Sequence, residues 1–320
     1  MSQPELHFII SAPRSGSTWL ASALNQHPQI FATEHRLFGN FCEMWPNNNG
    51  NLAPRITFDA YARAVSVHFQ FADSFETRHE FTDDFISEYL NFLLGYAKRK
   101  TGCSVIVDKI TPYPGTASIV IQQIQKFVPG AKIYKLIRDG RDVLTSGTFD
   151  WLLKDGNQTD RYEYYINRKR GFELKRFFDD DVIDKWAKTW KESVQSFQGL
   201  TPTATIKYED MVGDLPGQLQ SMYQSLEVES ALELAEQAAA KVAFEKTSGR
   251  PNGKMEATAK QRKGVIGDWK NFMTKHDGRR FHQIAGEVLI AAGYETNSDW
   301  LKDLPEVLAL KNETVAREAE

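Results

Sequence analysis

The chain has 320 residues, of which 41% are hydrophobic and 25% are charged, and its formal net charge at pH 7 is −3. This composition is typical of a globular protein with one large domain or two small ones. The small negative charge excludes a global basic field, so we expect no nucleic acid polymer as a ligand. No apolar run reaches the roughly 18 residues of a membrane span, and 2 cysteines make no disulfide framework.

Short apolar runs alternate with helical patterns along the chain. Buried strands are predicted at residues 6–11, 104–107, 132–137 and 203–207. Helices are predicted at residues 15–26, at 116–128 and from 141 onward. This alternation favours an α/β fold with a mainly parallel sheet. Residues 37–100 and 155–200 predict helical insertions that cover one end of the sheet, and residues 246–263 a long loop.

The N-terminus leaves little room before the first predicted strand, so we expect no signal peptide. Cys42 and Cys103 are expected to be reduced thiols, as in a cytoplasmic protein.

The first of three polar segments, residues 13–19, follows the strand predicted at 6–11 and opens the next helix. A helix N-terminus presents free N–H groups and partial positive charge, which bind phosphate. Gly16 lets the backbone approach a ligand, and Arg14 adds a fixed charge with a bidentate fork. Further hydroxyl donors are Ser15, Ser17 and Thr18. The alternative is an ordinary strand–turn–helix with an exposed arginine.

The second segment, residues 138–146, follows the strand predicted at 132–137. Arg138 lies at the carboxyl end of that strand, where open α/β sheets bind ligands. Ser146 lies two turns into the next helix and can face the same crevice. The alternative is a solvated salt-bridge cluster, which we favour for Arg141 and Asp142.

The third segment, residues 262–269, places Arg262 and Lys263 beside the flexible Gly264. A basic pair in a loop is more often exposed to solvent than functional, so this pair indicates a phosphate site only in combination with the first two segments.

A loop that binds ATP or GTP requires the pattern G-x-x-x-x-G-K-[ST]. Residues 13–19 contain a single glycine and no lysine, which argues against Mg²⁺-nucleoside triphosphate chemistry.

Together the three segments resemble those of the PAPS-dependent sulfotransferase superfamily, whose sulfuryl donor is 3′-phosphoadenosine 5′-phosphosulfate (PAPS). The resemblance runs from about residue 5 to 295, and residues 40–100 and 155–200 match poorly. It implies an α/β fold with a P-loop-NTPase-like parallel sheet flanked by helices, and with helical insertions covering the active site. It also implies a single sulfotransferase domain over residues 1–310, followed by a frayed tail at 311–320.

The resemblance assigns PAPS as donor, 3′,5′-ADP as product and no metal. The residues implied for the 5′ side are Arg14, Ser15, Gly16, Ser17 and Thr18. Those implied for the 3′-phosphate are Arg138, Ser146, Arg262, Lys263 and Gly264. Those implied near the adenine are Trp19 and Tyr208, with Thr247 or Ser248 beside them. The implied acceptor is a hydroxyl of a small molecule, a lipid or a carbohydrate.

The catalytic base departs from the pattern of the members that act on small molecules. Their histidine, in a Lys-Thr-His-Leu-Pro segment, is absent from the matching residues 108–112. Residues 33–38 resemble the segment in which other members carry a catalytic glutamate, which implies Glu34, or His35 if the register shifts by one. The alternative for Glu34 is a surface or ion-paired carboxylate, with Arg36 as partner. Arg14 and Lys109 are implied to stabilise charge on the leaving oxygen and the sulfuryl group.

Other interpretations stay open. The chain could instead be a nucleotide kinase, or a protein that binds 3′,5′-ADP without catalysis. Aromatic residues suggest an apolar acceptor pocket, although burial in the ordinary core is more common for such residues. They are Phe38, Phe41, Trp45, Phe149 and Trp151.

Two of the four signature residues of the family's dimer segment are present, Lys270 and Thr274. Its valine and its glutamate are replaced by Lys275 and Arg279, so the oligomeric state is left open.

Overall fold

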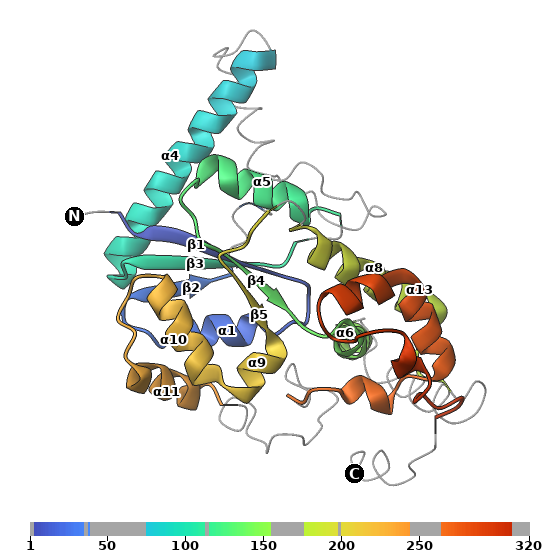
Figure 1. The fold of residues 1–320 in the computed structure, drawn as a ribbon. Helices are drawn as coiled ribbons and strands as arrows, with labels where there is room; N and C mark the ends of the chain where they lie inside the picture. Colours follow the sequence, from blue (N-terminus) through green and yellow to red (C-terminus); the bar gives the residue numbers. More distant parts are fainter. Residues whose placement is uncertain are drawn as a thin grey trace. The chain divides into compact units, whose positions relative to one another are not determined.

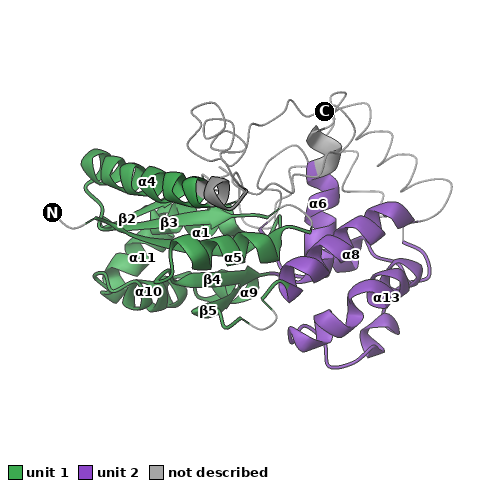
Figure 2. Ribbon diagram, turned by 90° about the horizontal axis from the view of Figure 1, so that it is seen from above, with its two compact units in different colours: residues 1–137, 196–243 green, residues 138–195, 244–320 purple. Residues whose placement is uncertain are grey.

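A computed structural model describes residues 3–34, 38, 75–112, 115–154, 176–197, 200–243 and 264–308. The chain forms two compact units (Figure 2). The first comprises Met1–Ile137 and Ser196–Ala243, and the second comprises Arg138–Gln195 and Phe244–Glu320. The single domain over residues 1–310 stays a prediction, and the tail at 311–320 lies outside the described residues.

The first unit is built on a 5-stranded parallel sheet with the strand order β2-β3-β1-β4-β5 (Figure 1). The strands are β1 (Glu5–Ser11), β2 (Ile30–Thr33), β3 (Val105–Ile110), β4 (Ile133–Ile137) and β5 (Ala204–Lys207). The predicted parallel α/β sheet is thus confirmed. The edge strand β2 was not predicted.

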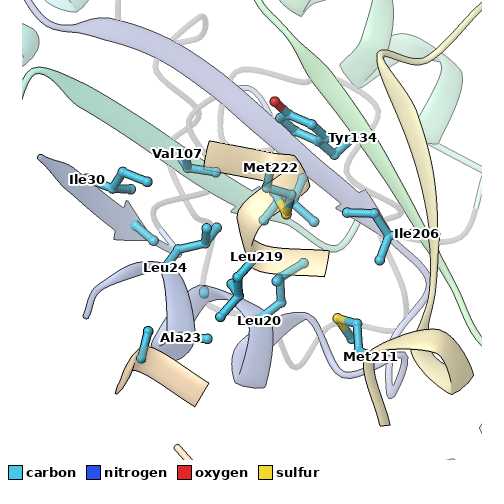
Figure 3. Close-up of a cluster of buried hydrophobic side chains, with 14 of the residues drawn as sticks. Leu20, Ala23, Leu24, Ile30, Val107, Tyr134, Ile206, Met211, Leu219 and Met222 are labelled. Atoms are coloured by element: carbon cyan, nitrogen blue, oxygen red, sulfur yellow. The ribbon is translucent and has the colours of Figure 1, made fainter. Parts of the chain in front are cut away.

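Helices cover both faces of this sheet (Figure 1). One face carries α1 (Ser17–Leu24), α9 (Tyr208–Gly213), α10 (Leu215–Ser225) and α11 (Leu232–Lys241). The other carries α4 (Phe75–Thr101) and α5 (Ala117–Phe127). On the first face Leu20 and Leu24 pack with Val107 and Tyr134 (Figure 3). Successive strand residues point to opposite faces, and because both faces are covered β1 and β3 are buried along almost their whole length.

The connections that leave β1 and β3 run to opposite faces of the sheet. The chain after β1 enters α1, and the chain after β3 enters α5. These two strands are neighbours, with Ile10 paired to Ile110. Open α/β sheets bind ligands at the carboxyl ends of strands where the connections diverge in this way. The topology therefore places a candidate site at the ends of β1 and β3.

The second unit packs helices around aromatic side chains. It contains α6 (Gly140–Lys154), α8 (Asp180–Gln195), η2 (Asp268–Asn271), α13 (Lys275–Ala291) and η3 (Asp299–Leu301). A Cβ on Gly140 would lie 2.6 Å from the ring of Trp190, so α6 can pack this closely on α8 only with glycine there. The helix α13 begins with a capping box, in which Thr274 and Asp277 satisfy each other's backbone N–H groups.

The helical character predicted for residues 37–100 and 155–200 is confirmed where residues are described, by α4 and α8. The helix α4 packs on one face of the sheet, and the predicted cover over one end of the sheet stays a prediction. The loop predicted at 246–263 lies outside the described residues. Within the described part of the chain, no helix is long and apolar enough to cross a membrane.

Two of the five aromatic residues considered for an acceptor pocket prove to be core. Phe38 is fully buried, with its ring centroid 5.5 Å from that of Phe8. Phe149 is buried against Phe177, with the ring centroids 5.2 Å apart. For these two side chains the alternative interpretation is therefore correct. Phe41, Trp45 and the side chain of Trp151 lie outside the described residues.

Candidate functional site

The loop predicted to bind phosphate connects β1 to α1 and has an unusual backbone. Arg14 has φ 64° and Gly16 has φ 87°, whereas Ser15 between them has no positive φ. A left-handed conformation costs a residue other than glycine about 1–3 kcal/mol, and such strain clusters at ligand clamps. Alternation of left-handed and ordinary residues turns successive N–H groups toward one point, which forms an anion-binding nest. The predicted phosphate-binding loop thus has a backbone suited to an anion.

The N-terminus of α1 also fits an anionic group. Within the described residues, no side chain caps the helix, and its first turn holds no acidic residue. The Ser15 hydroxyl is fully buried and finds no hydrogen-bond partner among the described residues. An unsatisfied buried hydroxyl costs about 1–3 kcal/mol, so an acceptor oxygen beside it would be favoured. The N–H groups and this hydroxyl are donors of the kind that a phosphate or sulfate group requires.

Two aromatic side chains predicted to contact adenine lie beside this loop. Tyr208, the first residue of α9, packs on Gly16: a Cβ on Gly16 would lie 2.5 Å from its Cδ2 atom. Trp19 meets Tyr208 edge-on, with ring centroids 6.0 Å apart. The Trp19 indole N–H also donates to the carbonyl of Val242 at 3.0 Å. Gly16 is therefore required both for its positive φ and for this close packing.

Three predicted site residues from separate segments meet at the carboxyl edge of the sheet. The Lys109 ammonium on β3 lies 2.7 Å from the Oε1 atom of Glu34, which follows β2. The same ammonium donates to the Oγ1 atom of Thr18 in the first turn of α1, at 3.2 Å. The Lys109 side chain is 4% exposed, whereas that of Glu34 is 44% exposed. The ion-paired alternative for Glu34 is thus found, with Lys109 as its partner; Arg36 lies outside the described residues.

The second unit brings the start of α6 together with the segment that follows Gly264. The Arg138 guanidinium donates from Nη2 to the carbonyl of Val265 at 3.3 Å, and it lies 3.8 Å from the Asp142 carboxylate. The Arg138 carbonyl accepts the Trp190 indole N–H at 2.9 Å. Gly264 has φ 67°, so its backbone favours glycine. Ser146 lies in α6 and is partly exposed.

The prediction that Arg141 and Asp142 form a solvated cluster is wrong. Arg141 is 2% exposed and Asp142 is 1% exposed. The Arg141 guanidinium binds Asp139 through Nε at 3.0 Å and Nη2 at 2.7 Å, and it binds Glu295 through Nη1 at 2.5 Å. It also lies 3.9 Å from the ring centroid of Trp269. A buried guanidinium is tolerated where carboxylates and an aromatic face replace water in this way.

Five of the predicted site residues lie outside the described residues: His35, Thr247, Ser248, Arg262 and Lys263. The described residues predicted for the 5′ side belong to the first unit, and those predicted for the 3′-phosphate belong to the second.

Sequence reasoning missed the role of Asp142 as an acceptor for backbone N–H groups. A signal was present, because Asp142 stands one helical turn after Arg138, but burial could not be inferred from that spacing.

A family model described as "Sulfotransferase domain" matches residues 4–293, a range that includes every predicted site residue. Among curated proteins, none matches this sequence.

Solved sulfotransferase structures are similar at low identity. Mouse sulfotransferase SULT7A1, complexed with PAP, is 17% identical over 94% of this chain and 89% of its own, with a TM-score of 0.49. The sulfotransferase domain of the Synechococcus PCC 7002 olefin synthase is 17% identical over 90% of this chain and 96% of its own, with a TM-score of 0.46. Retinol dehydratase in complex with retinol and PAP is 19% identical over 90% of this chain and 82% of its own, with a TM-score of 0.41.

Proposed function

The chain belongs to the sulfotransferase domain family, and from this membership we propose that it transfers a sulfuryl group from PAPS to an acceptor hydroxyl. The observation that carries the proposal is the loop after β1. There a strained Arg14 and a left-handed Gly16 lead into α1, and among the described residues no side chain caps this helix and none bonds to the buried Ser15 hydroxyl. These donors match a doubly anionic phosphosulfate better than an uncharged ligand.

We assign the 5′-phosphosulfate to this loop. The N–H groups of residues 15–18 and the hydroxyls of Ser15, Ser17 and Thr18 would donate to its oxygens. The Arg14 guanidinium would add a charge that cannot be lost by deprotonation. Trp19, half-buried beside Tyr208, offers an aromatic surface for the adenine.

We assign the 3′-phosphate to the second unit. Arg138 lies just before α6 and Ser146 lies within that helix, and Gly264 lies next to the Val265 carbonyl that Arg138 binds. Arg262 and Lys263 directly precede Gly264 in the sequence and would add two cations. A phosphate dianion is matched best by several cations and an N–H donor.

PAPS supplies the sulfuryl group, which passes to the acceptor oxygen as its bond to the phosphate oxygen breaks. In our proposal Glu34 accepts the proton of the acceptor hydroxyl, a role worth roughly 10²–10⁴ in rate. Its 44% exposure leaves the carboxylate open to an acceptor. Lys109, already held between Glu34 and Thr18, stands where its charge can stabilise both the carboxylate and the group bound by the first turn of α1. Arg14 stabilises the negative charge that builds on the leaving oxygen.

Calorimetry with 3′,5′-ADP, 5′-AMP and ATP tests the proposal. We expect 3′,5′-ADP to bind far more tightly than either of the others, because it alone of the three carries a 3′-phosphate. Equal affinity for 5′-AMP would contradict the proposal, and Mg²⁺-dependent turnover of ATP would indicate a kinase.

The acceptor is identified by a screen with sulfur-labelled PAPS against small-molecule, lipid and carbohydrate hydroxyls. We expect label to appear in one of these classes. Tight binding of 3′,5′-ADP with no labelled product from any class would instead indicate a binding protein without catalysis.

A further inference from the structure

The carboxylate of Asp142 binds two backbone N–H groups of the segment that follows Gly264. Its Oδ2 atom accepts the N–H of Gly267 at 2.7 Å, and its Oδ1 atom accepts the N–H of Trp269 at 3.0 Å. Asp142 lies in the first turn of α6 and is 1% exposed, so water does not compete for these bonds. Both oxygens of one buried carboxylate are therefore committed to one short stretch of backbone.

The geometry of that stretch depends on these bonds. Gly267 has φ 76° and caps the short helix η2, so the chain turns sharply between the two N–H groups that Asp142 binds. The Val265 carbonyl is held by Arg138, and the Trp269 ring is held under the Arg141 guanidinium. Three residues at the start of α6 thus contact the segment: Arg138, Arg141 and Asp142. Asp142 provides the two bonds to its backbone N–H groups.

We propose that Asp142 is a positioning residue that fixes residues 264–269 against the start of α6, and so holds the backbone of Gly264 in place for the 3′-phosphate. Asp142 itself touches no ligand in this proposal, because both of its oxygens are occupied by the segment. The proposal rests on the proposed function for its second half, the contact with the 3′-phosphate.

The charge of Asp142 matters for this role. A carboxylate accepts at both oxygens, whereas an asparagine would turn an N–H₂ group toward one of the two N–H donors. Burial raises the pKa of Asp142 to about 6, with Asp139 acting in the same direction, while Arg138 and the N–H groups of Gly267 and Trp269 act against it. At pH 7 the group is accordingly ionised in most molecules and can hold both N–H groups.

The test compares Asp142→Asn with Asp277→Asn. Asp277 is a matched control: it is also a fully buried carboxylate of the second unit, but it accepts from the Thr274 N–H at 2.9 Å and from Arg176 at 2.8 Å. Both substitutions remove a buried carboxylate from the same unit. An effect of general destabilisation is therefore shared by the two variants, and an effect on the segment is specific to Asp142→Asn.

The first readout is amide hydrogen exchange of residues 265–271 in the protein without nucleotide, at pH 7. We expect this segment to exchange roughly 10-fold faster or more in Asp142→Asn, and at the wild-type rate in Asp277→Asn, because hydrogen bonds to charged groups are worth about a factor of ten or more. Exchange in Asp142→Asn that equals that of the wild type overturns the proposal.

The second readout is the ratio of the affinities for 3′,5′-ADP and 5′-AMP, which isolates the 3′-phosphate. We expect Asp142→Asn to lower this ratio roughly 10-fold with the affinity for 5′-AMP unchanged, and Asp277→Asn to leave it unchanged. Faster exchange together with an unchanged ratio overturns the link to the 3′-phosphate. A wild-type ratio near one contradicts the proposed function, and the exchange result then decides by itself whether Asp142 anchors the segment.

Discussion

The ammonium of Lys109, on β3, lies 2.7 Å from the carboxylate of Glu34, which directly follows β2 and is far from Lys109 in the sequence. Their meeting follows from the strand order, because β2 and β3 are neighbours and pair Thr33 with Asp108, the residues just before them. Thr18, from the helix after β1, completes the contact through its hydroxyl. A proposed base and a proposed charge stabiliser thus share one ion pair, and neither is expected to act independently of the other.

The first prediction concerns the base. Glu34→Gln keeps the shape of the side chain but cannot accept a proton, so we expect turnover to fall roughly 10²-fold or more. The affinity for 3′,5′-ADP, measured by calorimetry, should stay nearly unchanged, because the proposed partner of Glu34 is the acceptor hydroxyl and not a phosphate. The control is His35→Asn, which should have the smaller effect. Loss of turnover in His35→Asn but not in Glu34→Gln would exchange the two roles.

The ion pair adds a second arm to that experiment. If Lys109 and Glu34 act as a unit, Lys109→Ala and the double variant with Glu34→Gln should lower turnover by similar factors, well short of the product of the two single effects. Effects that multiply would show that the two side chains act separately.

The second prediction separates charge from backbone strain at Arg14, whose φ is 64°. Arg14→Ala should lower kcat more than it raises the KM for PAPS, because the charge acts most strongly as the leaving group departs. Arg14→Gly should lose the same activity. It should nevertheless be more stable than Arg14→Ala by about 1 kcal/mol, because glycine adopts a positive φ without strain. Urea denaturation of the two variants measures this difference, and equal stabilities would show that Arg14 is unstrained.

The third prediction concerns the contact between Gly16 and Tyr208. In Gly16→Ala the new methyl group would lie 2.5 Å from Cδ2 of Tyr208, and the residue would still need φ 87°. We expect a loss of stability of about 2 kcal/mol or more and a large loss of 3′,5′-ADP affinity. Adding Tyr208→Ala should recover the part due to the steric clash but not the part due to φ. A Gly16→Ala variant that binds 3′,5′-ADP like the wild type would contradict the assignment of this loop.

The sequence was sufficient for features that depend on neighbours along the chain. The strands at β1, β3, β4 and β5 are short apolar runs bounded by turn residues, and the loop at residues 13–18 is a local motif. The pairing of Lys109 with Glu34 was not foreseen, because it depends on β2, a strand that was not predicted. Only the folded sheet brings β2 alongside β3, the strand that carries Lys109.

The same reason explains the error at Arg141 and Asp142. In the sequence they belong to a run of alternating charges, which usually faces solvent. Their burial depends on Glu295 and Trp269, which stand more than a hundred positions away and supply an ion pair and an aromatic face. No pattern within the run itself carries that information.

The fourth prediction is a pH dependence that originates at Asp142. Its pKa is raised from 3.8 to about 6, first because burial disfavours the charged form. Between these two values the folded protein holds a proton at Asp142 that the unfolded chain has lost. The stabilising contribution is therefore fully present below about pH 4 and is lost as the pH rises through about 6. Asp142→Asn has no such group, so the free energy of unfolding of the wild type should fall relative to that of the variant over this range.

Urea denaturation of both proteins at pH 4, 5, 6 and 7 measures the effect. Most other groups titrate alike in the two proteins and cancel in the difference between their free energies of unfolding. The slope of that difference should be negative and no steeper than about 1.4 kcal/mol per pH unit, the limit for a single proton. It should flatten above about pH 7, where Asp142 is ionised in both the folded and the unfolded wild type. A difference that is constant across the range, or that rises with pH, would show that the carboxylate is not held in the buried site between Arg138 and the N–H groups of Gly267 and Trp269.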